Sequence, residues 1–247
     1  MLFASDCGKI QYFLHPHFSK LRISPVFFMD TSKYLLTIYE KLDKYFGDLN
    51  WWPGETTFEI IVGAILTQNT SWENVKIAID NVKSKGVLDP GKLIEIKATT
   101  LAELIKPSGY YNVKTKRLKA FLRFLRQEYE LNLEAMFEEN LWTLRKKLLE
   151  VNGIGEETAD SILLYAGNKP IFVVDLYTRR ILQRHGIIDG RISYGDIQRL
   201  FMNNIPNNVR LFNQYHALLV NTGKHFCRKV PRCEGCPLEK TGVISMS

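Results

Sequence analysis

The sequence predicts an all-α protein, and two observations support that prediction. Apolar residues recur at spacings of three and four along almost all of the chain after Met29, which is the period of an amphipathic helix. No alternating run of apolar and polar residues is long enough for a sheet, and residues 171–174 form only a short apolar stretch between helical segments. Residues 1–28 precede the first helical pattern and are interpreted as an N-terminal extension whose place in the working protein is left open.

The expected helices follow one another in chain order. An apolar stripe begins at Leu35, and Gly47 stands where that helix would stop. A second stripe begins at Phe58, and a third follows Thr70 and Glu73, whose spacing is that of a capping box. Further helical patterns, separated by glycine and proline, are expected at residues 115–128, 142–150, 156–166, 176–184, 194–204 and 208–222.

Composition narrows the class of protein. Of 247 residues, 45% are hydrophobic and 24% are charged, so the chain can build a core and is unlike a disordered sequence. No apolar run approaches the roughly 20 residues that span a bilayer, and the N-terminus has no secretory h-region. The formal net charge of +7 favours an anionic partner such as nucleic acid.

The cysteines are unevenly distributed. Cys227, Cys233 and Cys236 lie within ten residues of one another, whereas Cys7 stands far away in the extension. A secreted disulfide framework would spread its cysteines, so the cluster favours a metal site in a reducing compartment. We therefore expect an intracellular, cytoplasmic protein.

A glycine hairpin is the most informative segment. Gly153, Ile154 and Gly155 separate one helical pattern from the next, which starts with acidic residues. Two glycines let backbone amides approach a phosphate closely, and the following helix N-terminus adds positive dipole. Ile154 would anchor the turn in the core. Taken alone, the pattern also fits an ordinary tight turn between helices.

An aspartate and a basic stretch complete the candidate site. Asp175 comes eighteen residues after Glu157 and directly before a helical pattern. A carboxylate in that place caps the helix and is held ionised by its dipole. Lys114 and Lys116 begin a basic stretch without acidic residues, which fits either a phosphate-binding surface or a solvated helix face.

Hairpin and aspartate together resemble the helix–hairpin–helix DNA glycosylases of the endonuclease III superfamily. The resemblance runs from about Tyr34 to Pro237, and it includes the segment Leu66-Thr67-Gln68-Asn69-Thr70 and the pattern from Gly109 to Lys114. It implies a two-lobed helix–hairpin–helix fold with a cleft between the lobes. One lobe would be a central bundle at 58–169, and the other would combine 30–57 with 170–247, including the cysteine loop.

The resemblance also implies roles. Asp175 would stabilise the positive charge that develops at C1′ as a flipped base leaves, and would orient the attacking water. Gln68, with Asn69 beside it, would help fill the gap left in the duplex. The other expected contacts to damaged double-stranded DNA are Gly153, Ile154, Gly155, Thr158, Lys114 and Lys116.

Glu157 decides the expected reaction. Family members that also cut the strand have a lysine two residues after the second hairpin glycine, and this chain has Glu157 there. A carboxylate cannot form the Schiff base of lyase chemistry. The resemblance therefore implies a monofunctional glycosylase without AP-lyase activity, acting as a monomer.

The expected base pocket consists of Trp51, Trp52, Pro53, Trp72 and Glu157. These residues resemble the bacterial 3-methyladenine DNA glycosylase branch. Aromatic rings and a carboxylate suit a cationic N-alkylated purine, which needs no strong general acid to leave. No histidine or Cys–His pair stands beside these motifs in the sequence, in agreement with that chemistry. Core packing is the alternative role for the tryptophans.

The metal site lacks one expected member. Many members of the superfamily end with four cysteines around a [4Fe–4S] cluster, but the fourth position here is Gly242. The resemblance implies a cluster whose fourth ligand is unknown; Cys7 is unsupported in that role. The alternatives are a zinc site completed by His225 or His185, or a remnant without metal.

Two other functions remain open at this point. On the same scaffold, the protein could be a mismatch or oxidised-pyrimidine glycosylase, because the hairpin carries no information about the base. It could also be a non-catalytic DNA-binding module, although the interval to Asp175 speaks against it.

Overall fold

The computed structural model describes residues 30–51 and 54–241, and this part of the chain contains helices and no strands. The predicted all-α class is thus confirmed. The N-terminal extension at 1–28, Trp52, Pro53 and Gly242 lie outside the described residues.

The helices are numbered in chain order. Their bounds are α1 Thr31–Phe46, α2 Thr57–Leu66, α3 Trp72–Ser84, α4 Pro90–Glu95, α5 Ala98–Leu104, the 3₁₀ turn η1 Lys106–Ser108, α6 Tyr111–Tyr129, α7 Leu133–Glu138, α8 Leu141–Glu150, α9 Glu156–Ser161, the π-turn η2 Ile162–Ala166, α10 Leu176–Arg184, α11 Tyr194–Met202 and α12 Val209–His225. The periodicity predicted every long helix but not α4, α5 or α7, whose six or seven residues are too few to show a clear period.

Side-chain caps fix where many of these helices begin. Asp30, Asp89, Asp175 and Asn208 each accept a hydrogen bond from a backbone N–H in the first turn that follows. The predicted capping box at the third helix is wrong by one residue. Ser71, not Thr70, is the N-cap of α3, and its side chain accepts from the N–H of Asn74.

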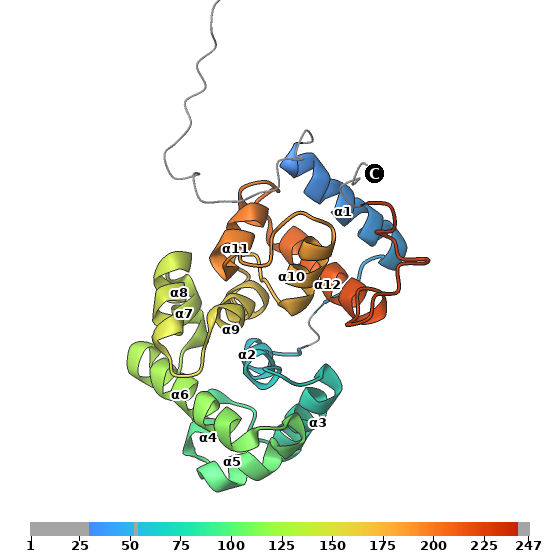
Figure 1. Cartoon of the computed structure of the whole chain (residues 1–247). Coiled ribbons are helices and arrows are strands. Elements are labelled where there is room, and N and C mark those ends of the chain that lie inside the picture. The colour runs from blue at the N-terminus through green and yellow to red at the C-terminus, as the bar shows by residue number, and fades with distance from the viewer. Residues whose placement is uncertain (1–29, 52–53, 242–247) are drawn as a thin grey trace, which may run out of the picture.

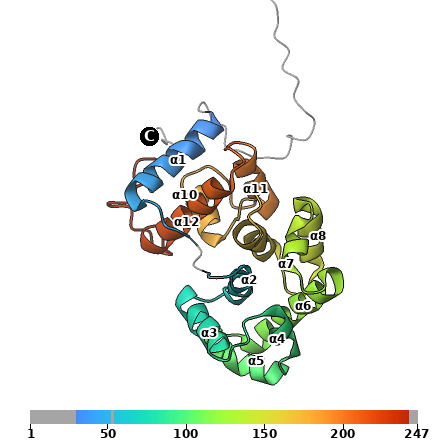
Figure 2. The same cartoon turned by 180° about the vertical axis from the view of Figure 1, so that it is seen from behind.

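The helices gather in two groups, as Figures 1 and 2 show from opposite sides. Helices α2 to α8 form one group, and α1 with α10, α11 and α12 form the other. Helix α9 and η2 lie between them, and η2 packs against both α2 and α12. The hairpin helix therefore joins the two groups, and its residues face both.

Extended backbone leads from η2 to α10. Ile171, Phe172, Val173 and Val174 are buried and are not in a strand, and the ring of Phe172 packs against Phe201 of α11 and Phe212 of α12. They hold the start of α10, and with it Asp175, against the core. In the part of the chain described, no helix is long and apolar enough to cross a membrane.

Candidate active site

The two glycines of the hairpin differ in backbone conformation and in the space around them. Gly153 has φ +87°, and a Cβ placed on it would lie 2.3 Å from the Cγ of Arg117, so both backbone and space require glycine. Gly155 has φ −92°, and a Cβ there would meet nothing within 4 Å. Ile154 between them is buried, as predicted. Gly155 thus leaves open space at the surface of the turn rather than relieving a clash within the protein.

Gln68 ties the end of α2 to this hairpin. Its Nε2 donates to the carbonyl of Gly153 at 3.1 Å and to Oγ1 of Thr158 at 2.8 Å, while Arg117 donates to its Oε1. The next residue, Asn69, is exposed with φ +55° in the left-handed region. The Gln68 amide is therefore bound within the protein, and Asn69 is exposed at the turn.

The two lysines predicted to bind DNA differ. Lys114 is 1% exposed, and its Nζ donates to the carbonyls of Leu66 at 2.8 Å and Ser108 at 2.6 Å. Burial lowers its pKa to about 8. The prediction that Lys114 contacts DNA is wrong, because its ammonium is used inside the fold; Lys116 is exposed.

Asp175 is the N-cap of α10. Its Oδ1 accepts the N–H of Thr178 at 2.7 Å, which fixes the side chain at the helix start. Its Oδ2 lies 3.8 Å from Nε2 of His216, and the side chain is 10% exposed. One oxygen therefore serves the helix, and the other faces an imidazole.

A buried network holds the segment before Asp175. Asp160 accepts hydrogen bonds from Arg145 at 2.7 Å, from the Tyr194 hydroxyl at 2.8 Å and from Gln198 at 2.7 Å. The same Tyr194 oxygen accepts the N–H of Val174 at 3.3 Å. The network links the hairpin helix to α11 and fixes the residue directly before Asp175.

Glu157 is the second carboxyl group of the site. Part of its side chain is reached by solvent, yet surrounding protein and the negative charge of Asp175 raise the pKa of Glu157 to about 7. Near neutral pH the site therefore holds Asp175 beside a carboxyl group that is close to half protonated. Two carboxyl groups in unlike environments can take different roles.

Tyr165 and His216 belong to the site and were not predicted from the sequence. The expectation that no histidine stands beside these motifs is wrong for the folded chain, in which His216 faces Asp175. His216 is 5% exposed, its Nδ1 is hydrogen-bonded to the Tyr165 hydroxyl, and its Nε2 faces Asp175. Burial lowers the pKa of His216, against the opposing effect of Asp175. The available signal was a single histidine inside the apolar run of residues 215–220.

Trp51 and Trp72 lie in different environments. Trp51 is partly buried, and Nζ of Lys224 lies 5.8 Å from the centre of its ring. Trp72 is partly buried at the start of α3 and packs against the core. Trp51 therefore has a cation at its ring, and both tryptophans remain sequence-based candidates for the pocket.

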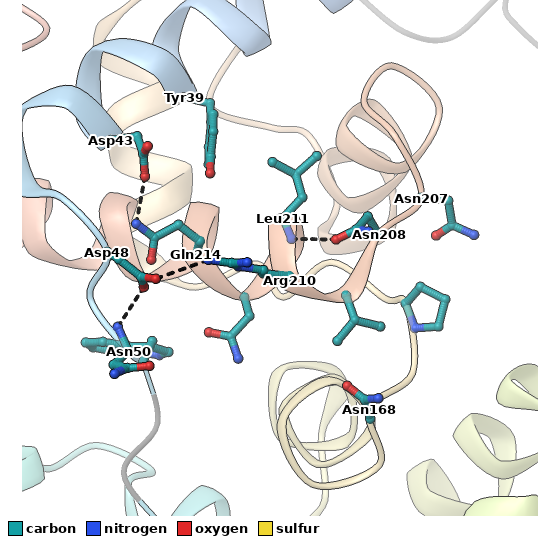
Figure 3. A pocket seen from close by; sticks show the side chains of 14 residues that line it. Tyr39, Asp43, Asp48, Asn50, Asn168, Asn207, Asn208, Arg210, Leu211 and Gln214 are labelled. Carbon is teal, nitrogen blue, oxygen red and sulfur yellow. Dashed lines mark hydrogen bonds and ion pairs between the residues drawn. The ribbon is translucent and has the colours of Figure 1, made fainter.

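A cavity of about 1040 Å³ adjoins Trp51 (Figure 3). Its lining comes from α1, the segment after α1 and the start of α12, with Asn168 opposite. Figure 3 shows Asp43 bonded to Gln214 and Asp48 paired with Arg210. Neither Asp175 nor Glu157 is among the described residues that line it, so the cavity does not contain the carboxyl pair.

The cysteine loop is held by arginines. Arg180 donates to the carbonyl of Cys227 at 2.6 Å, and Arg184 donates to the Cys227 sulfur at 3.3 Å and to the carbonyl of Arg228 at 2.6 Å. Burial and the neighbouring thiols raise the pKa of Cys236. Thiolates suit iron or zinc, but within 30–51 and 54–241 no three potential ligands converge on a metal position, so the described residues do not fit the expected cluster.

Comparison with known proteins places these features in a family. Residues 62–207 match the model of the HhH-GPD superfamily of base excision DNA repair proteins. A provisionally named DNA repair glycosylase of Methanocaldococcus jannaschii is 46% identical over 204 residues, which cover 82% of this chain and 93% of that protein. Endonuclease III of Sulfolobus acidocaldarius is 28% identical over 181 residues, covering 72% of this chain and 78% of the relative.

Two solved structures are similar as well. The H. pylori 3-methyladenine DNA glycosylase bound to 1,N6-ethenoadenine aligns with a TM-score of 0.70 and 29% identity, covering 79% of this chain and 98% of that one. A non-covalent endonuclease III–DNA complex aligns with a TM-score of 0.74 at 20% identity, covering 87% and 96%. These similarities confirm the predicted helix–hairpin–helix glycosylase fold.

Proposed function

The chain belongs to the HhH-GPD superfamily of base excision DNA repair proteins, and on that premise we propose that it is a monofunctional DNA glycosylase. The proposed substrate is a flipped N-alkylated purine such as 3-methyladenine in double-stranded DNA. The observation that carries the proposal is Glu157, a carboxyl group under the influence of the Asp175 charge, at the position where a lyase would have its amine.

Asp175 is the proposed catalytic residue. As the bond to the base breaks, C1′ gains positive charge, and a fixed carboxylate stabilises that charge without reorganising. A water that attacks C1′ must lose a proton, and the Asp175 carboxylate can accept it. The helix cap at Oδ1 supports this role because it leaves the carboxylate one orientation.

The base class is proposed from the groups around Asp175. Above its pKa of about 7, Glu157 adds a second negative charge that favours a cationic base. Trp51 offers an aromatic ring that already attracts the Lys224 ammonium. The similarity to a 3-methyladenine DNA glycosylase supports the same class.

The proposed DNA interface is the exposed side of the hairpin. Gly155 leaves open space where a phosphate can approach backbone N–H groups, and Lys116 and Asn69 are exposed nearby candidates. Gln68 would have to exchange its bonds with Thr158 and Gly153 to fill a gap in the duplex. We further propose action as a monomer inside the cell.

The direct test is release of free bases from N-methylated duplex DNA, with strand breaks scored before and after alkali. Free 3-methyladenine with breaks only after alkali supports the proposal. Breaks without alkali would mean that another amine performs lyase chemistry. The Asp175→Asn variant is the control for contaminating glycosylases.

A second candidate is an oxidised-pyrimidine glycosylase, favoured by the similarity to endonuclease III of Sulfolobus acidocaldarius. The same assay on DNA that contains an oxidised pyrimidine distinguishes the two. Excision from that substrate alone would keep the role of Asp175 and overturn the alkylpurine pocket.

A further inference from the structure

We propose that His216 and Tyr165 form a buried relay that orients Asp175 from behind. The inference deepens the proposed function and rests on it. His216 acts as a positioning residue, since it touches Asp175 and not the reacting atoms. The relay would fix the orientation of the carboxylate that stabilises the positive charge at C1′.

The relay is assembled from three elements that meet in the core. Tyr165 belongs to the π-turn η2, His216 lies in the middle of α12, and Asp175 caps α10. Helix α12 packs against both η2 and α10. Tyr165 and His216 are both buried, so solvent does not compete for their hydrogen bonds. A π-turn is uncommon and is frequent at functional sites.

The proton positions follow from electrostatics. Burial keeps His216 neutral, because it lowers the pKa of the imidazole, and raises the pKa of Tyr165 well above its ordinary value. One of the two ring nitrogens therefore carries the single proton. If Nδ1 carried it, the lone pair of Nε2 would face the carboxylate of Asp175, which is unfavourable.

The opposite tautomer directs both donors at acceptors, although Nε2 of His216 has no partner within hydrogen-bond distance among the described residues. The Tyr165 hydroxyl donates to Nδ1 of His216, and Nε2–H points at Oδ2 of Asp175. The series therefore runs from the Tyr165 hydroxyl through His216 to the Asp175 carboxylate.

This arrangement fixes both carboxylate oxygens. Oδ1 accepts the N–H of Thr178 at 2.7 Å, and Oδ2 faces Nε2–H at 3.8 Å. The second distance is longer than a hydrogen bond, and such contacts commonly tighten when the substrate binds. The relay contributes a donor without a net positive charge, so the site keeps its attraction for a cationic base.

The first test compares two histidine variants. His216→Leu removes the donor, and His216→Gln retains an N–H that can reach Asp175. We expect His216→Leu to lower the single-turnover excision rate about 100-fold, the scale of a misplaced catalytic group, with DNA affinity nearly unchanged. His216→Gln should recover most of that loss. Equal activity of wild type and His216→Leu would overturn the relay.

The pH profile separates positioning from structure. The groups that face Asp175 are Glu157 from α9, Tyr165 from η2 and His216 from α12. Loss of the Nε2–H donor makes the carboxylate harder to keep ionised, so the acidic limb of the rate profile should move to higher pH in His216→Leu. A variant that is slower at every pH with an unmoved limb would indicate a structural role and contradict the proposal.

Tyr165→Phe has a matched control in Tyr215→Phe. Both hydroxyls are buried and hydrogen-bonded, but that of Tyr215 donates to the carbonyl of Leu35 at 2.8 Å, away from Asp175. Both variants should lose similar stability in thermal melts, and only Tyr165→Phe should lower the excision rate and move the acidic limb. Equal effects of the two variants on the rate would overturn the role of Tyr165.

A measurement without substrate distinguishes failure of the relay from failure of the proposed function. Nitrogen NMR of the five histidines, assigned with His216→Gln, reports which ring nitrogen of His216 is protonated. We expect protonated Nε2 and bare Nδ1. Protonated Nδ1 would overturn the relay whatever the enzyme excises, whereas the expected tautomer in a protein without glycosylase activity would overturn only the function.

Discussion

The two ends of α10 are held by opposite means. At its N-terminus Asp175 accepts a backbone N–H and faces His216 in a nearly closed environment. At its C-terminal half Arg180 and Arg184 donate to carbonyl oxygens of the cysteine loop, and Arg184 does so at the surface. One short helix therefore connects a buried acidic site to an exposed basic loop. We expect the exposed Arg228, Lys229 and Arg232 of that loop to contact DNA phosphates, so chemistry and DNA contact should respond separately to mutation.

Asp175→Asn changes the N-terminal end of α10 and should lower the excision rate more than any other substitution considered. Asparagine caps helices as well as aspartate does, so α10 should remain intact. Loss of the negative charge should lower the single-turnover excision rate by about 10³-fold or more, the scale of a lost electrostatic partner. Binding to lesion DNA should persist. Unchanged turnover would end the assignment of Asp175.

Glu157→Gln tests how the carboxyl group next to Asp175, at the N-terminal end of α10, affects the choice of base. The raised pKa of about 7 predicts that excision of a cationic base increases as pH rises through 7 and Glu157 ionises. The variant should lose that increase, with roughly 10-fold lower rates above pH 7, and should retain activity on a neutral base. Equal loss on both substrates would assign Glu157 a structural role only.

The stability of the fold should also depend on the ionisation of Glu157. The pKa of Glu157 is raised in the fold from its ordinary 4.5, so the folded state binds the proton more tightly than the unfolded chain. Its contribution to stability is present below pH 4.5 and is lost as pH rises through about 7. The melting temperature of wild type should therefore fall over this range relative to Glu157→Gln, and parallel curves would contradict the shift.

Arg184→Ala tests the other end of α10. The side chain donates to the carbonyls of Arg228 at 2.6 Å and Lys229 at 2.9 Å. Its loss should cost about 1.5–3 kcal/mol of local stability, the range for hydrogen bonds from a charged donor, and should make the loop more sensitive to protease. DNA affinity should fall while the rate at saturating enzyme stays unchanged.

Arg191→Ala is the matched control. Arg191 is exposed, and in the part of the chain described its side chain makes no recorded hydrogen bond or ion pair. The control should therefore leave stability and protease sensitivity of the loop at wild-type levels. A reduced chemical rate in Arg184→Ala at saturation would mean that the two ends of α10 are not separable.

Cys233→Ser should give the smallest effect. Cys233 is exposed, and the arginines already hold the loop, so the free energy of unfolding should change by less than about 0.5 kcal/mol. Iron and zinc quantitation of purified wild type and variant accompanies the melt. Loss of bound iron together with a large fall in stability would restore the [4Fe–4S] cluster that the resemblance implied.

The N-terminal end of α10 could be predicted from the sequence, because its structure depends on residues that are close together in the chain. The helix at 176–184 and the cap at Asp175 were predicted as they stand, because a capping residue and an apolar period are both local signals. The burial of Lys114 could not be predicted in that way. Its ammonium is bound by two carbonyls that only the folded chain brings together, while Lys116, two residues on, is exposed.

His216 was missed for the same reason. Asp175 and His216 are 41 residues apart in the chain, and nothing near either residue announces the other. The three short helices were missed because six or seven residues give too few turns for a period. Local rules therefore predicted most of the fold and the place of Asp175 at the start of α10, but not the partners that lie behind it.

The π-turn after α9 also sets the direction in which the Tyr165 side chain points. Each residue advances an α-helix by about 100°, whereas the i→i+5 bonds of a π-turn make a wider turn in which each residue advances less. Deleting a single residue within Ile162–Ala166 would restore α-helical winding and rotate Tyr165 away from α12. A one-residue gap at this point in a related sequence would therefore mark an enzyme that orients its aspartate by other means.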